Sequence, residues 1–348
     1  MNIECQACHK RFHIPEERLP AKDKIAFPCP ACRELITLVL RPPSEGLNNV
    51  HTCASSPVDI SENRLTGTSL KLRILETVTD LPSMPETVIK AREIIADANS
   101  SFDELSTVLE TDQAIAARIL KIANSAYYGL KGTVSSIQHA SVVLGYKTLE
   151  ELITVAGTSN LLGRDLKGYE QDAGDLWQHS LAVAFGSKAI AARIESSLSD
   201  DAFAAGLIHD AGKLALDPYL AERKEMFREF MTRGDKSFLT AEKEVLGFDH
   251  AEIAYELCRN WSVPDTLTRA VRYHHDPSLS DKDVLAYIVH VADAIALMSG
   301  IGAGLDGMLY RIDDDALRFL GLRDEDIHEI MIEMVEAVQK LTDEMHDM

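Results

Sequence analysis

Hydrophobic residues recur every three or four positions along most of the chain from Leu70 onward. The spacing is clearest in the stretches LKLRILETV, ETVIKAREII and DQAIAARILKIANSA. Such spacing gathers the apolar side chains on one face of an α-helix. The pattern therefore predicts an all-α domain over residues 67–348, with an N-terminal helical lobe over about 67–165 and a second lobe over about 166–348.

Short polar residues mark where some of these helices begin. Ser101 precedes Glu104, and Thr148 precedes Glu151, with the spacing of a capping box. Asp112 stands directly before QAIAARILKIA, where its carboxylate can accept hydrogen bonds from the first free backbone N–H groups. We expect helices to start at these three places.

The first 40 residues carry two CxxC pairs and a different pattern. Cys5 and Cys8 form one pair, and Cys29 and Cys32 form the other. Four thiolates at this spacing can surround one Zn²⁺ tetrahedrally, and so short a segment needs such a metal to fold stably. A redox dithiol or free surface thiols are the alternatives. The segment resembles the short zinc ribbons at the N-termini of many bacterial regulatory proteins, so we predict a zinc ribbon over residues 1–40.

Residues 41–66 are rich in Pro, Ser and Asn and show no apolar period, which predicts a flexible linker. Apolar residues make up 46% of the chain, enough for a sizeable core. The formal charge of -20 makes nucleic acid an unexpected partner, although the ribbon is locally basic. No apolar run is long enough for a membrane span, and the start is no signal peptide, so we expect a cytoplasmic protein without a membrane partner. Oligomeric state is left open.

Candidate chemistry begins in AFAAGLIHDAGKLAL, residues 202–216, which reads as one apolar helix. It carries His209, Asp210 and Lys213 among apolar residues. Buried charges need partners, so the pair either shares a divalent metal or is satisfied by neighbouring side chains. Lys213 follows His209 by four residues, which would place its ammonium on the same face, near an anion bound to the metal.

Further imidazole and carboxylate groups occur in apolar surroundings later in the chain. These are His179, His250, His274, His275 and Asp293, with His290 as a rival to Asp293. Any one of these histidines alone reads as an ordinary core residue. As a set on several helices, they indicate a site for Zn, Mn, Fe or Ni. Asn124, Tyr127 and Tyr128 are weaker candidates for ligand or partner contact, since such residues more often cap and pack.

Several long blocks resemble the HDOD family, a helical signalling domain related to the HD superfamily of metal-dependent phosphohydrolases. They include LPSMPETVIKAREII, VLETDQAIAARILKIANSAYYG, VSSIQHASVVLGYKTLEELI and AGLIHDAGKLAL, in order between Leu70 and about Asp276. The resemblance implies one metal held by His179, His209, Asp210 and Asp293. Likeness to HD-GYP phosphodiesterases implies a second metal near Asp210, with His250, His274 and His275 as further ligands.

The resemblance also sets the functional expectation. The stretch HHDPSLSDKDVLAY lacks the Gly-Tyr-Pro turn of the HD-GYP enzymes, so hydrolysis of cyclic diguanylate is not expected. HDOD domains are generally regulatory, which implies a signal-transduction protein with signalling proteins as partners and a buried metal cluster. The alternative is a metal-dependent phosphohydrolase acting on a nucleotide or other phosphoester. In that case Lys213 would contact the phosphate.

Overall fold

A computed structural model describes residues 2–4, 11–13, 24–28, 35–39, 66–78, 85–97, 99–130, 132–232, 238–261, 263–302 and 312–345. The chain divides into two compact units, Met1–Asp59 and Ile60–Met348. The four predicted zinc ligands, Cys5, Cys8, Cys29 and Cys32, lie outside the described residues, as does most of the predicted linker.

The first unit contains two antiparallel β-hairpins. Their strands are β1 (Asn2–Glu4), β2 (Arg11–His13), β3 (Lys24–Pro28) and β4 (Leu35–Val39). Strand β1 pairs with β2, and β3 pairs with β4. Each CxxC pair falls, along the chain, between the two strands of one hairpin.

The described residues of the second unit form helices and no strand, as the apolar period predicts. The α-helices are α1 (Gly67–Val78), α2 (Glu86–Ala96), α3 (Phe102–Glu110), α4 (Gln113–Ala123), α5 (Ile137–Leu162), α6 (Asp175–Ile194), α7 (Ser199–Ile208), α8 (Gly212–Glu222), α9 (Lys224–Thr232), α10 (Phe238–Leu246), α11 (His250–Asn260), α12 (Asp265–Tyr273), α13 (Val284–Met298), α14 (Asp314–Leu320) and α15 (Asp324–Met345). Two 3₁₀ segments, η3 (Ser196–Leu198) and η4 (Pro277–Ser280), lie between them.

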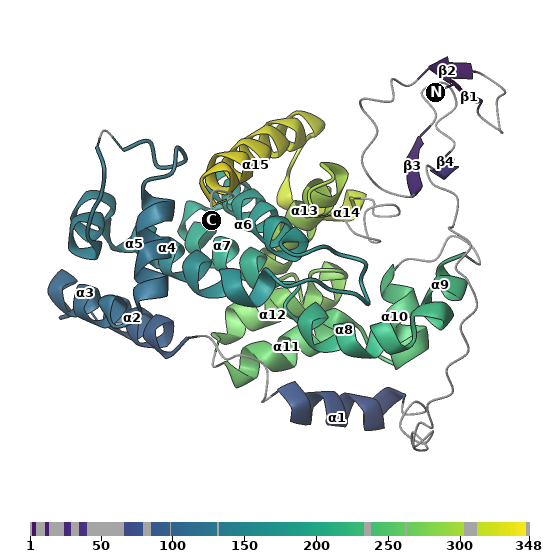
Figure 1. The fold of residues 1–348 in the computed structure, drawn as a ribbon, viewed down its shortest axis with the longest axis horizontal. Helices are drawn as coiled ribbons and strands as arrows, with labels where there is room; N and C mark the ends of the chain where they lie inside the picture. The colour runs from purple at the N-terminus through teal and green to yellow at the C-terminus, as the bar shows by residue number, and fades with distance from the viewer. Residues whose placement is uncertain are drawn as a thin grey trace, which may run out of the picture. The chain divides into compact units, whose positions relative to one another are not determined.

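Helix packing groups these elements around α6. Helices α2 to α5 pack on one another, and α6 packs against α7, α13 and α15 (Figure 1). Helices α8, α11 and α12 extend the same body. Helix α1 packs on α8 and α11, although the predicted division placed residues 67–78 with the first lobe. The exact lobe boundaries remain predictions.

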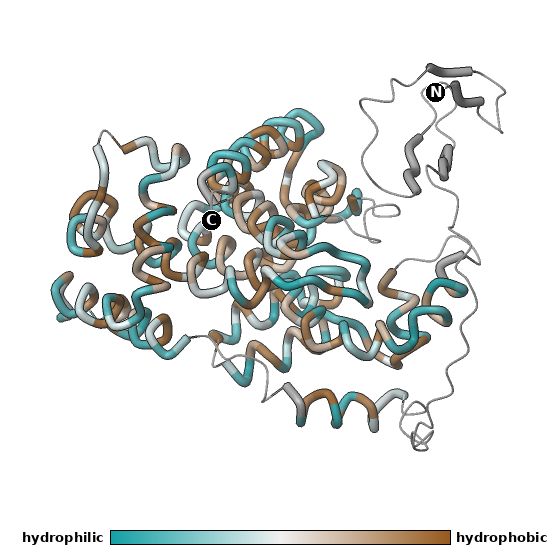
Figure 2. The backbone as a smooth tube through the Cα atoms, viewed as in Figure 1, coloured by the Kyte–Doolittle hydropathy of each residue, from teal (hydrophilic) through white to brown (hydrophobic). Residues whose placement is uncertain are grey.

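Helix α13 lies at the centre of the apolar core. Every residue from Leu285 to Leu297 is buried, which is typical of a helix surrounded by others. Helix α15 instead alternates between hydrophobic and hydrophilic residues along its length (Figure 2). Ile330 and Met334 are fully buried, whereas Ile332 is exposed. Among the described residues, no helix combines the length and apolarity that crossing a bilayer requires.

Two of the three predicted helix starts are confirmed. Ser101 and Glu104 form the full capping box, and the Asp112 carboxylate accepts hydrogen bonds at the start of α4. The prediction at Thr148 is wrong, because this residue lies inside α5. That helix bends three residues earlier at Gly145, whose φ of 77° and ψ of 169° suit a residue without Cβ.

The prediction of one helix over residues 202–216 is also wrong. Helix α7 ends at Ile208 and α8 begins at Gly212, so His209 and Asp210 lie in a turn between them. Backbone N–H groups bond three residues back there: Ala211 donates to the Ile208 carbonyl at 3.0 Å. This tighter winding turns the chain and sends α8 in a new direction.

Candidate metal centre

The turn between α7 and α8 meets four other parts of the helical unit at one buried polar site. We call its seven residues the His/Asp cluster: His179 on α6, His209 and Asp210 in the turn, His250 at the start of α11, His274 and His275 after α12, and Asp293 on α13. Six of these side chains are no more than 3% exposed, and that of His275 is 13% exposed. All seven residues that the sequence singled out for this cluster therefore converge.

The cluster separates into two adjacent groups. His179, His209 and Asp293 form the first subsite, and Asp210, His250, His274 and His275 form the second subsite. Within each group the candidate ligand atoms lie within 4.8 Å of one another. Ligand atoms about 2.0–2.2 Å from one metal are themselves at most about 4.4 Å apart, so each group has nearly the size of a metal shell.

Asp210 connects the two subsites through its two oxygens. Its Oδ2 lies 3.4 Å from Nε2 of His209, and its Oδ1 lies 3.1 Å from Nε2 of His250. In the first subsite, Nε2 of His179 is 3.1 Å from Oδ1 of Asp293. A carboxylate shared in this way is suited to two neighbouring cations.

His209 and His274 turn the same ring atom toward the centre. Nδ1 of His209 donates to the Gly206 carbonyl at 2.7 Å, and Nδ1 of His274 donates to the Val271 carbonyl at 2.7 Å. These bonds place a proton on Nδ1, so Nε2 is the atom that a metal can take once the ring is neutral. Both carbonyls come from the last turn before each histidine, so local backbone geometry sets the direction of the ring.

Some inward-facing atoms make no hydrogen bond to the protein. Among the described residues, Nε2 of His209, Nε2 of His274 and Oδ1 of Asp210 are buried without a hydrogen bond. Buried polar atoms are nearly always satisfied, so three such atoms in one place call for a ligand. Nitrogen lone pairs and carboxylate oxygens are the donors that divalent transition metals take, and the residues therefore fit a metal.

Burial and mutual charge tune the protonation of the cluster. Burial, helped by the nearby charge of His209, lowers the pKa of His274 to about 3. Burial opposes ionisation of Asp293, but the hydrogen bond from His179 outweighs it and lowers the Asp293 pKa to about 2. The pKa of Asp210 is likewise well below its ordinary value, because His209 and other cations outweigh burial. Burial opposes the charged forms of His209 and His250, but the neighbouring carboxylates outweigh it and raise the pKa of both, so a metal that binds there would displace a proton from each imidazole.

Lys213 belongs to the same buried site, but not as the sequence predicted. Its Nζ lies 2.7 Å from Oδ2 of Asp210, three residues earlier, and 5.6 Å from the centre of the Tyr169 ring. The expected placement on the face of His209 assumed a continuous helix, which the turn at residues 209–211 interrupts. Contact between Lys213 and a phosphate remains a prediction.

The sequence analysis missed two residues of this site and listed a third as a rival ligand. Glu242 on α10 accepts a hydrogen bond from Nδ1 of His250 at 2.7 Å. Tyr169, in the segment before α6, donates to the same carboxylate. Nδ1 of His290 faces the carbonyl of His274 at 2.7 Å, and the ligand groups contain Asp293 rather than His290. Glu242 sits in the charged stretch AEKEVLGF, which reads as a surface helix.

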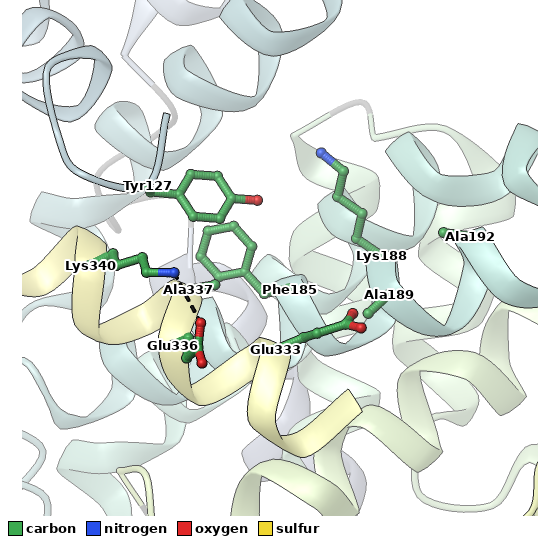
Figure 3. A pocket seen from close by; sticks show the side chains of 9 residues that line it. All are labelled: Tyr127, Phe185, Lys188, Ala189, Ala192, Glu333, Glu336, Ala337 and Lys340. Atoms are coloured by element: carbon green, nitrogen blue, oxygen red, sulfur yellow. Dashed lines mark hydrogen bonds and ion pairs between the residues drawn. The ribbon is translucent and has the colours of Figure 1, made fainter. Parts of the chain in front are cut away.

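A separate hollow of about 360 Å³ lies between α6, α15 and the turn that carries Tyr127 (Figure 3). Phe185 and three alanines form its apolar lining. Its charged residues are paired within the protein: Lys188 with Glu151, Glu333 with Arg193, and Glu336 with Lys340. The hollow thus offers no uncommitted charge to a ligand.

The three polar candidates near that hollow have different surroundings. The Asn124 amide bonds the backbone of Leu120 and Val134, which is a packing role. Tyr128 meets Tyr127 edge to face, and Tyr127 alone of the three lines the hollow. Ligand or partner contact by these residues remains a prediction.

Comparison with known proteins agrees with this architecture. The sequence model of the HDOD domain family matches residues 81–277, more than half of the chain. The chain belongs to the HDOD family. A zinc-ribbon domain model matches residues 1–37, in agreement with the predicted ribbon. Both the family and the all-helical fold with an N-terminal ribbon are confirmed.

Solved HDOD structures show the same fold. An HDOD domain protein of unknown function from Geobacter sulfurreducens is 25% identical, with a TM-score of 0.65 over 78% of this chain and 95% of that one. A candidate phosphohydrolase from Shewanella amazonensis SB2B is 23% identical, with a TM-score of 0.59 over 78% of this chain and 97% of that one. A candidate signal transduction protein from Marinobacter aquaeolei VT8 is 24% identical, with a TM-score of 0.61 over 81% of this chain and 64% of that one.

One curated relative is longer than the part that this chain matches. An uncharacterised protein of Treponema pallidum (strain Nichols) is 22% identical over 210 residues, which are 60% of this chain and 40% of the relative. The chain therefore matches less than half of that protein's length. The family model defines the family, and the solved structures show the fold.

Proposed function

We propose that this HDOD protein is a signal-transduction regulator whose helical unit binds two divalent transition metal ions in the His/Asp cluster. The observation that carries the proposal is the convergence of two adjacent ligand groups, joined by Asp210, with buried Nε2 and carboxylate atoms that make no hydrogen bond to the protein. Fe, Mn, Ni and Zn all accept imidazole and carboxylate ligands. A bound metal would neutralise the buried carboxylates and tie together α6, α11 and α13.

The near-complete burial of the cluster favours regulation over catalysis. Within the His/Asp cluster, only the His275 side chain is more than 3% exposed. A hydrolytic metal site needs an open coordination position facing a cleft, where substrate can enter. A closed site suits a metal that stabilises one conformation of a domain, which a partner protein then recognises.

Hydrolysis of a phosphoester is the second candidate function, and Lys213 is the observation in its favour. Its ammonium is buried beside the carboxylate that joins the two subsites. Two metals in such a site can bind a phosphate and supply a nucleophile at neutral pH. Lys213 would then stabilise negative charge on the phosphate, and Asp210 would hold Lys213 in place.

We also propose that the ribbon binds one Zn²⁺ through Cys5, Cys8, Cys29 and Cys32. Support comes from the two CxxC pairs and from the zinc-ribbon match over residues 1–37. Thiolate ligands prefer zinc, whereas the imidazole-rich cluster accepts several metals. The two sites should therefore differ in metal selectivity.

Elemental analysis of the purified full chain tests the proposal. We expect one zinc per chain from the ribbon and two further metals from the His/Asp cluster. His209→Ala should lose cluster metal and keep the ribbon zinc, whereas Cys5→Ser should do the reverse. A single metal per chain that survives His209→Ala and is lost in Cys5→Ser would refute metal binding by the helical unit.

Assays on the metal-loaded chain separate the two functional classes. Phosphodiesters and nucleotides are incubated with protein loaded with Mn²⁺, Fe²⁺ or Ni²⁺. A regulator gives no turnover with any of them. Turnover that vanishes in a folded Asp210→Asn variant would establish the hydrolase instead.

A further inference from the structure

The second subsite has an outer layer that begins at Glu242, eight residues before His250 in the chain. Glu242 is fully buried, and its Oε2 accepts two hydrogen bonds from His250: from Nδ1 at 2.7 Å and from the backbone N–H at 2.9 Å. The imidazole is thereby fixed in direction and in tautomer. Its Nε2 points at Oδ1 of Asp210, 3.1 Å away.

Tyr169 fixes the other end of the same carboxylate. Its hydroxyl donates to Oε1 of Glu242 at 2.5 Å, and the Tyr169 side chain is 1% exposed. The ring stacks on Phe238 at a centroid distance of 5.3 Å. With both oxygens engaged, the Glu242 carboxylate cannot rotate away from His250 without breaking a buried hydrogen bond.

The segment that carries Tyr169 is itself held firmly. Leu166 and Gln171 form an antiparallel bridge with bonds of 2.9 and 3.0 Å. Between them, Glu170 adopts a φ of 54°, an uncommon value for a residue with a side chain. Its carboxylate pairs with Lys224 at 3.0 Å and with Arg228, both on α9.

The same segment also reaches the first subsite. Gln171 is 4% exposed, and its Nε2 donates to the Gly302 carbonyl at 2.9 Å. The neighbouring carbonyl, that of Ile301, faces Nδ1 of His179 at 3.3 Å. Tyr169 thus supports His250 of the second subsite through the Glu242 carboxylate. Gln171 supports His179 of the first subsite through the backbone of residues 301 and 302.

We propose that Glu242 and Tyr169 are positioning residues that set the metal affinity of the second subsite through His250. The inference rests on the proposed metal centre and adds residues that do not touch the metal. A carboxylate that accepts the Nδ1 proton raises the basicity of Nε2 and removes the rotational freedom of the ring. Losing such a partner weakens metal binding by roughly ten- to a hundredfold. We expect the loss of metal affinity in the second subsite alone. The hydrogen bonds described for Glu242 go to Tyr169 and His250, and none goes to a side chain of the first subsite.

Titration of the metal-free full chain with Co²⁺ tests the inference, using visible absorption to separate thiolate ligation in the ribbon from imidazole ligation in the cluster. In the wild-type protein we expect two cluster binding steps. Glu242→Gln keeps the size of the side chain but loses the charge, and we expect one step to weaken by roughly ten- to a hundredfold. Tyr169→Phe removes one hydroxyl and should weaken the same step by roughly two- to tenfold, the value of one hydrogen bond.

Matched substitutions control for unspecific effects. Glu151→Gln makes the same change at another buried carboxylate, which pairs with Lys188 outside the cluster. Tyr146→Phe removes a hydroxyl that bonds the Ser100 carbonyl. Both variants should bind Co²⁺ like the wild-type protein. A purely structural role of Glu242 would lower the melting temperature of the metal-free protein and leave the ratio of the two affinities unchanged.

The outcomes distinguish this inference from the function on which it rests. Suppose that the wild-type cluster takes up two Co²⁺ ions and that Glu242→Gln and Tyr169→Phe bind them with unchanged affinities. Positioning by Glu242 and Tyr169 is then wrong, and the metal centre stands. If the wild-type cluster takes up none, both ideas fail together. Should Glu242→Gln not fold, the milder Tyr169→Phe decides: an unchanged second step overturns the inference.

Discussion

Two groups of charged side chains in the helical unit have opposite characters. Glu151 and Lys188, between α5 and α6, neutralise each other, and the Lys188 ammonium also lies 5.7 Å from the centre of the Phe203 ring. The His/Asp cluster brings two carboxylates and five imidazoles together and still leaves buried nitrogen and oxygen atoms without a hydrogen bond. A balanced pair is complete within the protein, whereas the cluster is complete only with a ligand.

The largest effect is expected from removing the carboxylate that joins the two subsites. Asp210→Ala takes ligand atoms from both groups and removes the carboxylate partner of the buried Lys213 ammonium. Breaking a buried charge pair from one side costs about 3–5 kcal/mol. We expect a loss of that order in the free energy of unfolding, measured by denaturant titration, together with the loss of both cluster metals. Retention of both metals would contradict the bridging role of Asp210.

Removing metal from the wild-type protein should have a slightly smaller effect. A ligand present at 100 to 1,000 times its dissociation constant stabilises the folded state by about 3–4 kcal/mol. Unfolding followed by far-UV circular dichroism reports on the helical unit, and a chelator should lower its stability by that amount. His209→Ala should be insensitive to the chelator, whereas Glu151→Gln should respond like the wild type. Equal sensitivity of all three proteins would show that the cluster is not the site of the effect.

A smaller effect is expected at Gly212, where α8 meets α11. A Cβ added there would lie 2.0 Å from the His250 carbonyl oxygen and 2.7 Å from the Ala254 nitrogen, so backbone would have to move. Overpacking of this kind costs about 1–3 kcal/mol. We expect Gly212→Ala to lose that much stability and to weaken Co²⁺ binding, because Asp210 and His250 sit at this contact. Gly132→Ala, where nothing lies within 4 Å of an added Cβ, is the control and should change neither.

The smallest effect on stability is expected at the ion pair of Glu151 and Lys188. Burial raises the pKa of Glu151 in spite of the Lys188 ammonium, so the folded protein holds this proton more tightly than the unfolded chain. The resulting stability is present below the ordinary value of 4.5 and is lost as pH rises through the folded pKa. Glu151→Gln cannot ionise and should not show this loss.

Denaturant titrations across pH values from ~4 to ~7 measure that difference. The unfolding free energy of Glu151→Gln minus that of the wild type should increase with pH, by less than about 1 kcal/mol because the Lys188 head is partly exposed and screened. A difference that stays flat or falls with rising pH would refute the assignment.

Local pattern was enough for several features. The apolar period predicted the helices, and Ser101 and Asp112 cap them as expected because an N-cap depends on residues within one turn. The same local reasoning failed at His209, where the predicted helix is interrupted by a turn. Helix propensity does not reveal this turn, which precedes a close approach between α8 and α11 at Gly212. Glu242 was missed for a related reason: in its own stretch it looks like one more surface acid.

The amino-acid pattern alone predicts the helical class, the two-part organisation with a zinc-ribbon segment, and seven polar residues that would not be buried one at a time. Packing of the helices is what brings these residues into two adjacent groups around Asp210, pairs Lys213 with that carboxylate, and places Glu242 and Tyr169 behind His250. Residue type and short-range spacing are written in the chain, so local preferences follow from them directly. Distances between residues 73 to 131 positions apart depend on how whole helices pack, which no short stretch encodes.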